Sequence, residues 1–144
     1  MIRTGVPRAA LRDLLRAVDL PVDDLEELDL RHCLRCGSED DPRGVVGLEL
    51  YGEQGLLRSL AVRPAARGHG CGVALVVAAE RHAAIHGVRT LHLLTETAEG
   101  FFRGLGYEPC QRSDAPEAIR RTRQFAGLCP ESAAFLSKSL TDSV

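Results

Sequence analysis

The pattern of apolar and polar positions predicts a chain in which strands and helices alternate. The apolar residues of Arg8–Val18 share one helical face, and the longer apolar run Val73–His86 also predicts a helix. Short apolar runs bounded by turn-forming residues are typical of strands. The predicted strands are Met1–Thr4, His32–Cys36, Val45–Tyr51, Leu56–Val62, Thr90–Thr95, Tyr107–Gln111 and Ala133–Leu140.

Three shorter helices are predicted as well. One begins at Asp23–Asp24, whose acidic residues suit a helix N-terminus, and one covers Glu99–Gly104. The third runs from Ala115 to Ala126, with Asp114 as its cap and Pro116 in its first turn. The leucines of the first are expected to face inward: Leu25, Leu28 and Leu30.

Composition and charge narrow the classes of function. A chain of 144 residues with 44% hydrophobic residues fits one folded domain. With 18 basic and 20 acidic residues the net charge is −2, which gives no general attraction to nucleic acid or an anionic membrane. The chain has no apolar N-terminal region and no run long enough to cross a bilayer, so a cytoplasmic protein is expected. The five cysteines follow no framework spacing and are expected to be free thiols.

The stretch Arg67–Gly72 is the most informative part of the sequence. It joins the predicted strand Leu56–Val62 to the predicted helix Val73–His86 with the spacing Arg-x-x-Gly-x-Gly. A strand-to-helix turn of this kind directs several backbone N–H groups at one point, and the helix N-terminus adds partial positive charge. Glycines let an anion approach the backbone, and Arg67 adds a cation at the rim. The stretch therefore predicts a phosphate-binding loop.

Two other phosphate-binding motifs do not fit this loop. A P-loop ends in Gly-Lys-Ser/Thr, whereas Gly72 is followed by Val73–Ala74. The dinucleotide fingerprint has the spacing G-x-G-x-x-G, whereas Gly68–Gly72 reads G-x-G-x-G. Glu96, after the strand Thr90–Thr95, is the one feature that matches the dinucleotide pattern.

The segment Leu60–Gly72 as a whole resembles the acetyl-CoA motif of the GCN5-related N-acetyltransferase superfamily. The resemblance implies that acetyl-CoA is the cosubstrate and that main-chain groups of Leu60 and Val62 contact its pantetheine arm. It also implies that the loop holds the pyrophosphate, and it places Thr95 and Phe102 beside the cofactor. The loop residues given this role are Arg67, Gly68, His69, Gly70, Cys71 and Gly72.

The same resemblance covers nearly the whole chain and implies a fold. It implies a single α/β (α+β) domain over residues 1–144, with a mixed central sheet of six to seven strands flanked by helices. A helical insertion at residues 113–131 would lie between the last two strands. The resemblance implies a small-molecule amine as the partner and a monomer or homodimer, and no metal is expected. No nucleic acid or membrane partner is expected.

Acetyl transfer to an amine requires a held thioester, a neutral amine and an in-line approach. Glu49 is the candidate base, since a turn at Gly52–Gly55 brings it near Arg58 across a hairpin. The two could equally form an ion pair without a catalytic role. A third interpretation has Arg58 bind an anionic group of the substrate while Glu49 receives the amine proton. The usual acid of the superfamily is a Tyr, but the matching position here is Phe102, and Tyr107 falls at a packing position.

A basic segment, Arg112–Pro130, precedes the last predicted strand. Three of its arginines fall within one turn: Arg120, Arg121 and Arg123. In one interpretation the segment is a lid whose arginines, Arg120 among them, select an anionic substrate. In the other it is a solvated helix that covers the sheet edge, with Ile119 and Phe125 facing inward.

Several blocks resemble the arsenic-resistance N-acetyltransferases, a branch of the superfamily. The blocks are Gly47–Glu49, Leu56–Val62, Leu93–Phe102, Gly106–Tyr107 and Asp114–Pro130. This resemblance implies acetylation of a small amine, for which an amino-bearing organoarsenical is a candidate. Two alternatives stay open: acetylation of another small amine or a protein N-terminus, and a weakly catalytic acetyl-CoA or arsenic-binding module.

The remaining histidines and cysteines support weaker hypotheses. His92 has a pKa suited to a base, but a buried structural histidine is the alternative. His82 and His86 are expected to be solvated helix positions. Cys33-x-x-Cys36 has no second pair at zinc spacing, and on a strand its two side chains would point to opposite faces. Two or three of the thiols could in principle bind trivalent arsenic.

Overall fold

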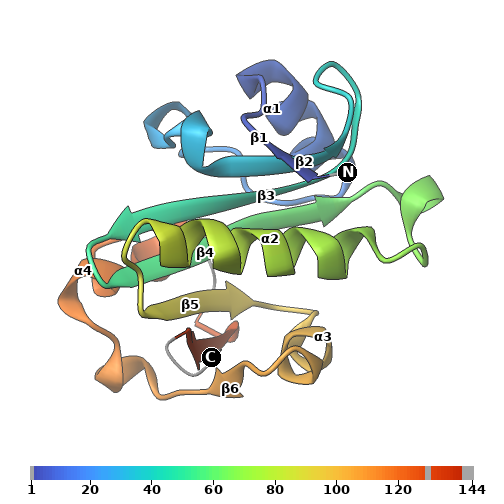
Figure 1. Ribbon diagram of the computed structural model, residues 1–144. Helices are drawn as coiled ribbons and strands as arrows, with labels where there is room; N and C mark the ends of the chain where they lie inside the picture. The colour runs from blue at the N-terminus through green and yellow to red at the C-terminus, as the bar shows by residue number, and fades with distance from the viewer. Residues whose placement is uncertain (1, 129–130, 141–144) are drawn as a thin grey trace. The chain divides into compact units, whose positions relative to one another are not determined.

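The computed structural model describes residues 2–128 and 131–140 of the chain. It contains a seven-stranded sheet with the strand order β1-β2-β3-β4-β5-β7-β6 (Figure 1). The strands are β1 (Ile2–Thr4), β2 (Cys33–Gly37), β3 (Pro42–Tyr51), β4 (Gln54–Val62), β5 (Thr90–Thr95), β6 (Glu108–Pro109) and β7 (Ala134–Ser139). The α-helices are α1 (Arg8–Ala17), α2 (Cys71–Ile85), α3 (Glu99–Gly104) and α4 (Glu117–Arg120).

The sheet is mixed, as predicted. β4 and β5 are parallel, with the register Gln54↔Thr90 to Leu56↔His92. The pairs β1–β2, β2–β3, β5–β7 and β6–β7 are antiparallel. No helix in the described ranges is both long and apolar enough to span a membrane.

The chain divides into two compact units. Met1–Glu49 with Leu57–His82 form the first unit, and Leu50–Leu56 with Ala83–Val144 form the second. β3, β4 and α2 each contribute residues to both units. The candidate site residues are therefore described unit by unit.

In the first unit, α1 and α2 cover opposite faces of β3. Leu11, Leu14 and Leu15 of α1 are fully buried in a cluster that includes Val45 of β3. The next residue, Gly44, lies against α2, because a Cβ built on it would be 2.7 Å from the Cys71 sulfur. Neighbouring residues of a strand point to opposite faces, so the two contacts place the helices on opposite sides. The whole cluster is Val6, Leu11, Leu14, Leu15, Leu25, Leu28, Cys33, Val45 and Ala61.

In the second unit, a smaller apolar cluster joins β4, β7 and the α4 segment. Ile119 is fully buried with Leu56 and Phe135, and Phe125 packs against this cluster with its ring edge-on to Phe135. The prediction that Ile119 and Phe125 face inward is confirmed. The buried members of the cluster are Leu56, Ala115, Ile119 and Phe135.

The predicted helix from Ala115 to Ala126 is wrong, because the segment is broken into three short turns. A 3-10 turn at Arg112–Asp114 precedes α4, which has only four residues, and a π-helical turn follows at Gln124–Leu128. The N-cap position belongs to Pro116, not to the predicted Asp114. The ring of Pro116 keeps the residue before it extended, so the helix cannot begin earlier.

The hydroxyl of Thr122 explains why α4 stops so early. It donates to the carbonyl of Ile119 (2.7 Å) and accepts from the N–H of Phe125 (3.2 Å). A side chain that satisfies the backbone on both sides competes with continued α-helical bonding. The chain therefore turns at Thr122 and resumes in the π-helical turn.

Two other predicted elements differ from the structure. The helix expected from Asp23 is a pair of 3-10 turns, Leu25–Glu27 and Leu30–His32, because the backbone at Leu28 is extended and interrupts it. The strand expected at Tyr107–Gln111 is reduced to Glu108–Pro109, where proline removes a ladder donor. Residues 141–144 and Cys129, one of the five cysteines, lie outside the described residues.

Replacement of Gly44 by Ala is expected to reduce the free energy of unfolding by about 1–3 kcal/mol. The new Cβ would meet the Cys71 sulfur at 2.7 Å, a Leu75 methyl group at 3.0 Å and the Ala61 carbonyl at 3.2 Å, so α2 would have to move from β3. Urea denaturation of G44A and the native protein measures the change. The matched control is G100A in α3, where a Cβ has no neighbour within 4 Å. Equal stability of G44A and the native protein would contradict the close approach.

His92 on β5 is a buried, neutral histidine. It is 6% exposed and its ring stacks on Phe135, with centroids 5.7 Å apart. Its Nε2 lies 2.7 Å from the amide oxygen of Gln54, so Nε2 carries the proton, and Nδ1 is buried without a hydrogen-bond partner. Burial lowers the pKa of His92 below its ordinary value of 6.5. These contacts favour the structural role over a catalytic one.

The free energy of unfolding is expected to fall as the pH is lowered below about 6.5, in part because of His92. The unfolded chain takes up a proton at this residue while the buried ring does not, so the group contributes a slope of up to about 1.4 kcal/mol per pH unit. Urea denaturation between pH 7 and pH 5 measures the slope. It should be smaller in H92Q and unchanged in the control H69Q, which alters an exposed histidine. An unchanged slope in H92Q would refute the assignment.

Candidate functional site

The loop between β4 and α2 has the geometry of an anion-binding turn. After a 3-10 turn at Pro64–Ala66, the chain passes through two glycines with left-handed φ angles, +83° at Gly68 and +79° at Gly70. Side chains there would strain the backbone. The N–H of Ala74 donates to the carbonyl of Gly70 (3.0 Å), so the N–H groups before it in α2 have no acceptor within the helix. These groups form the positive end of the α2 dipole.

The side chain of Arg67 links this loop to the end of β4 by a hydrogen bond. Its Nε donates to the carbonyl of Val62 (3.2 Å), and its side chain is exposed. The guanidinium therefore lies at the rim of the loop, where the sequence predicts a cation. The predicted loop residues are contiguous in this turn, with the first four exposed and the last two covered: Arg67, Gly68, His69, Gly70, Cys71 and Gly72.

β4 is irregular immediately before Leu60. Ser59 has a φ of +58°, a left-handed conformation that residues other than glycine rarely adopt. The recorded pairs of β4 with β5 end at Leu56, before this point. A distortion of this kind turns backbone groups out of a regular ladder. Such groups at Leu60 and Val62 are what the predicted pantetheine contacts require, and those contacts stay predictions.

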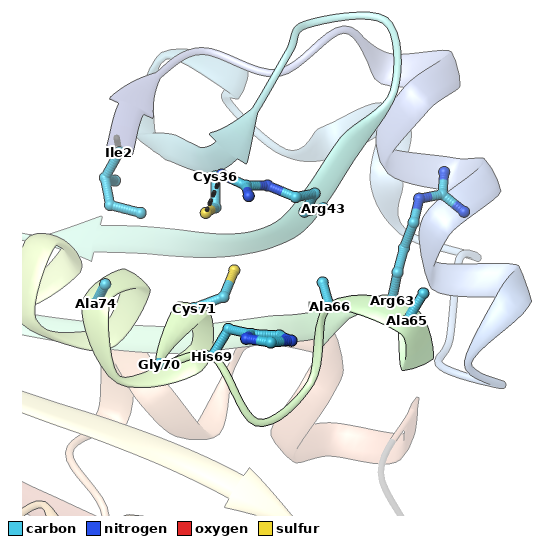
Figure 2. Close-up of a pocket in the computed structure, with 10 residues that line it drawn as sticks. All are labelled: Ile2, Cys36, Arg43, Arg63, Ala65, Ala66, His69, Gly70, Cys71 and Ala74. Atoms are coloured by element: carbon cyan, nitrogen blue, oxygen red, sulfur yellow. Dashed lines mark hydrogen bonds between the residues drawn. The ribbon is translucent and has the colours of Figure 1, made fainter.

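A cavity of about 630 Å³ adjoins the loop in the first unit (Figure 2). Arg43 and Arg63 lend it positive charge, and the side chains of Cys36 and Cys71 point toward each other from β2 and the start of α2. Arg43 donates from Nη2 to the Cys36 sulfur (3.7 Å). The lining residues are Ile2, Cys36, Arg43, Arg63, Ala65, Ala66, His69, Gly70, Cys71 and Ala74.

Two thiols of the first unit, those of Cys33 and Cys71, are held in their neutral form. Burial, followed by a hydrogen bond with Cys36, raises the pKa of Cys71 to about 11. Burial raises the pKa of Cys33 to about 12. The prediction that Cys33 and Cys36 point to opposite faces is confirmed, because Cys33 belongs to the α1 cluster and Cys36 lines the cavity. Neither Cys33 nor Cys71 is a nucleophile at neutral pH.

A buried cluster of three charged side chains lies in the first unit. The Arg58 guanidinium donates to both carboxylate oxygens of Asp24, one of them at 2.6 Å, and to Glu49 at 2.9 Å. Its Nε also donates to the hydroxyl of Ser59 (3.1 Å). Burial opposes the charge on Arg58, but the hydrogen bonds to Asp24 and then to Glu49 outweigh it and raise its pKa. The predicted proximity of Glu49 and Arg58 is therefore confirmed.

The two carboxylates of this cluster differ in their access to solvent. The side chain of Asp24 is 4% exposed, whereas that of Glu49 is 16% exposed. One positive charge shared by two negative charges leaves the cluster with a net charge of −1. Glu49 is thus the carboxylate that an incoming proton can reach.

The predicted site residues of the second unit lie at the end of β5 and in α3. The hydroxyl of Thr95 accepts a hydrogen bond from the N–H of Ala98 (3.0 Å). Phe102 is buried and packs edge-on against Tyr107, whose ring lies under the Lys138 ammonium at 5.6 Å. The packing position expected for Tyr107 is confirmed, since it is 1% exposed. The cofactor contacts of Thr95 and Phe102 stay predictions.

Arg120 lies exposed on α4. The neighbouring Arg121 forms an ion pair with Glu117 at 2.6 Å. An exposed guanidinium is free to meet an anion from solvent, but the substrate contact of Arg120 also stays a prediction.

Sequence reasoning missed three residues of this site. Asp24 was expected only to start a helix, yet it is the main partner of Arg58. Arg43 was assigned no role and Cys36 was considered only as a thiol ligand, yet both line the cavity. The Asp24–Arg58 contact joins positions 34 apart, so no local spacing could have predicted it.

Residues 30–109 match the family model described as an acetyltransferase (GNAT) domain, and this is more than half of the 144 residues. No curated protein matches the sequence.

Solved structures with low sequence identity share the fold. One is N-acetylglutamate synthase from Neisseria gonorrhoeae, complexed with coenzyme A and N-acetyl-glutamate (TM-score 0.78, 19% identity, 97% of this chain, 35% of that chain). Another is Rv2747 from Mycobacterium tuberculosis, in complex with CoA (TM-score 0.75, 19% identity, 96% of this chain, 98% of that chain). A third is an aminoglycoside 6'-N-acetyltransferase complexed with coenzyme A (TM-score 0.73, 19% identity, 97% of this chain, 97% of that chain).

The present chain spans about a third of the length of the synthase. It spans nearly the whole of the other two proteins. The fold is thus common to all three, and the family model adds the match in sequence. The chain belongs to the GNAT family of acetyltransferase domains.

Proposed function

We propose that this protein transfers an acetyl group from acetyl-CoA to the amine of a small molecule. The observation that carries the proposal is the turn between β4 and α2, where two left-handed glycines precede the N–H groups that open a 15-residue helix. Such a turn suits the pyrophosphate of coenzyme A. Membership of the GNAT family supports the same cosubstrate.

In this proposal the loop and β4 hold the cosubstrate. The amides that open α2 bind the pyrophosphate, and Arg67 at the rim adds a cation. His69 and Cys71 line the same turn. Main-chain groups of Leu60 and Val62, beyond the irregularity at Ser59, pair with the pantetheine arm. We also assign cofactor contacts to Thr95 and Phe102 of the second unit.

Glu49 is the proposed general base. It is the more exposed carboxylate of its cluster, and Arg58 fixes its position through the 2.9 Å hydrogen bond. Asp24 accepts hydrogen bonds from both terminal nitrogens of Arg58 and so fixes the guanidinium. One of these nitrogens, Nη1, also donates to Glu49. We assign Arg58 to positioning the base, because a guanidinium that is 2% exposed has little access to a substrate anion.

The chemical step in this proposal is direct attack. The amine nitrogen forms a bond to the thioester carbonyl carbon, the carbon–sulfur bond breaks, and Glu49 takes the amine proton. The leaving thiolate takes a proton from water, because Phe102 stands where the superfamily commonly has Tyr. A neutral Cys71 thiol, with its pKa raised to about 11, argues against an acyl-cysteine intermediate.

The acceptor proposed is an amino-bearing organoarsenical, in the cytoplasm, with a role in arsenic resistance. This finer proposal rests on the sequence resemblance described above, and the exposed Arg120 would suit an acidic group on such a substrate. Another small amine is the first alternative. A weakly catalytic acetyl-CoA-binding module is the second, since Phe102 replaces the usual acid.

Charge reversal at Arg67 is expected to raise the Kd for acetyl-CoA at least about tenfold, because a repelling carboxylate replaces a charge-assisted donor beside the pyrophosphate. Isothermal titration of R67E against the native protein measures this. The control R81E makes the same charge change at an exposed position of α2 and should bind as the native protein does. If R67E and R81E bind acetyl-CoA equally well, the placement of the pyrophosphate is wrong.

Replacement of Glu49 by Gln is expected to lower kcat about 10²- to 10³-fold while acetyl-CoA affinity is kept, because the amine loses its proton acceptor. A thiol-release assay with a panel of amines, organoarsenicals included, provides kcat. The control is E53Q, which removes an exposed carboxylate from the β3–β4 turn.

The outcomes of this assay separate the alternatives. Turnover of an amino-bearing organoarsenical in preference to other amines supports the finer proposal, and preference for another amine removes it. Tight acetyl-CoA binding without turnover of any amine would favour the binding module. Equal kcat values for E49Q and E53Q would leave Glu49 as an ion-pair partner only.

A further inference from the structure

Two histidines in the first unit face each other away from the loop and the charge cluster. His32 ends the 3-10 turn before β2, and His82 lies in the last turns of α2. The Nδ1 of His32 is 2.9 Å from the Nε2 of His82, and the ring centroids are 5.2 Å apart. Both residues are half-buried, so the sequence-based expectation that His82 is a solvated helix position is wrong.

The second ring nitrogen of His32 faces a carboxylate. Its Nε2 is 3.8 Å from an oxygen of Asp29. Arg31 binds this carboxylate through its backbone N–H and two guanidinium nitrogens. The carboxylate favours a proton on Nε2, which leaves a lone pair on Nδ1 directed toward His82. A carboxylate behind the far nitrogen of an imidazole is the usual second-shell partner of a metal-binding histidine.

A third imidazole follows in the sequence. His86 comes four residues after His82 and directly follows the last residue of α2. One ring nitrogen from each of His32, His82 and His86 lies within 4.8 Å of the other two. The chain thus supplies three nitrogen ligands of one chemical type near the end of α2.

We propose that His32, His82 and His86 bind a divalent transition-metal ion, with Zn²⁺ as the best-suited candidate. Zn²⁺ takes nitrogen ligands at about 2.0–2.1 Å, so two nitrogens of a tetrahedral site lie about 3.3 Å apart. The observed 2.9 Å between His32 and His82 is within a few tenths of an ångström of that spacing. Three histidines leave the fourth position of a tetrahedral ion to solvent.

The proposal departs from the expectation of no metal, for which only the Cys33-x-x-Cys36 spacing was weighed and not the histidines. A direct histidine–histidine hydrogen bond is the competing explanation of the 2.9 Å contact. That bond needs one donor and one acceptor and would give no affinity for an ion. Bound metal would also join the segment before β2 to α2, so it should raise the stability of the fold through mass action.

The test is titration of tag-free native protein with Zn²⁺, followed by Co²⁺ as a spectroscopic probe. One equivalent is expected to bind with visible Co²⁺ bands and without the near-ultraviolet absorption of a cobalt–thiolate bond. The Kd should rise at least about tenfold in H32A and H82A, and about 10- to 100-fold in D29N. The Tm should rise with Zn²⁺ in the native protein and stay constant in H82A.

The control is H69A, which removes an imidazole from the cavity and should leave the Zn²⁺ affinity unchanged. Circular dichroism confirms that each variant is folded, and acetyl-CoA binding confirms it for H32A, H82A and D29N. H82A introduces a strong helix former into α2. The proposal is overturned if native protein binds Zn²⁺ no more tightly than the H32A/H82A double variant. A cobalt–thiolate band would assign the metal to the cysteines, and an equal loss of affinity in H69A would assign it to the cavity. Either result would overturn the proposal as well.

Discussion

The buried charge of Arg58 is the constraint on which the first unit depends. Its side chain is 2% exposed, and an ion removed from water to this extent costs several kcal/mol unless it is paired. Asp24 and Glu49 provide the pairing from two different parts of the chain, a 3-10 segment and β3. Removal of one partner of such a cluster commonly destabilises a protein by about 3–5 kcal/mol. The cluster therefore fixes the path of the 3-10 segment as well as the orientation of Glu49.

The start of α2 depends on a second constraint, which is steric. Gly44 has no side chain, so the Cys71 sulfur lies directly against this residue of β3. Gly44 is also the residue that pairs with Cys36 of β2. The two thiols meet there, and burial with their mutual hydrogen bond keeps Cys71 neutral. Because the first residue of α2 is seated in this way, the loop before it has little freedom. The two left-handed glycines then carry the backbone from β4 to that fixed point.

Local signals predicted most of the fold, and long-range contacts account for most of what the sequence could not supply. Thr90–Thr95 and Glu99–Gly104 match the predicted bounds, because apolar runs and a terminal glycine mark them within a few residues. The helix after Asp114 failed because one hydroxyl, that of Thr122, replaces backbone bonds, and composition alone cannot reveal such a replacement. In the candidate site, too, the residues that are adjacent in the sequence could be predicted, and the long-range contacts could not. The loop follows from six adjacent residues, whereas Asp24 and the His32–His82 contact join positions far apart in the chain.

The proposed reaction removes a proton from the amine and adds one to the leaving thiolate. The pKa values of these two groups indicate that it depends more on a base than on an acid. An alkyl ammonium group with a pKa near 10.4 is almost entirely charged at neutral pH, and removal of its proton corresponds to about 4–5 kcal/mol. A thiol has a pKa near 8.5, so the departing thiolate is stable enough to leave before it is protonated. The demand for proton transfer therefore falls on the amine side of the reaction. In the proposed reaction Glu49 accepts this proton, with its carboxylate fixed by Arg58 and its side chain partly open to solvent. Phe102 has no part in proton transfer in this proposal, and its burial against Tyr107 contributes to the packing of α3.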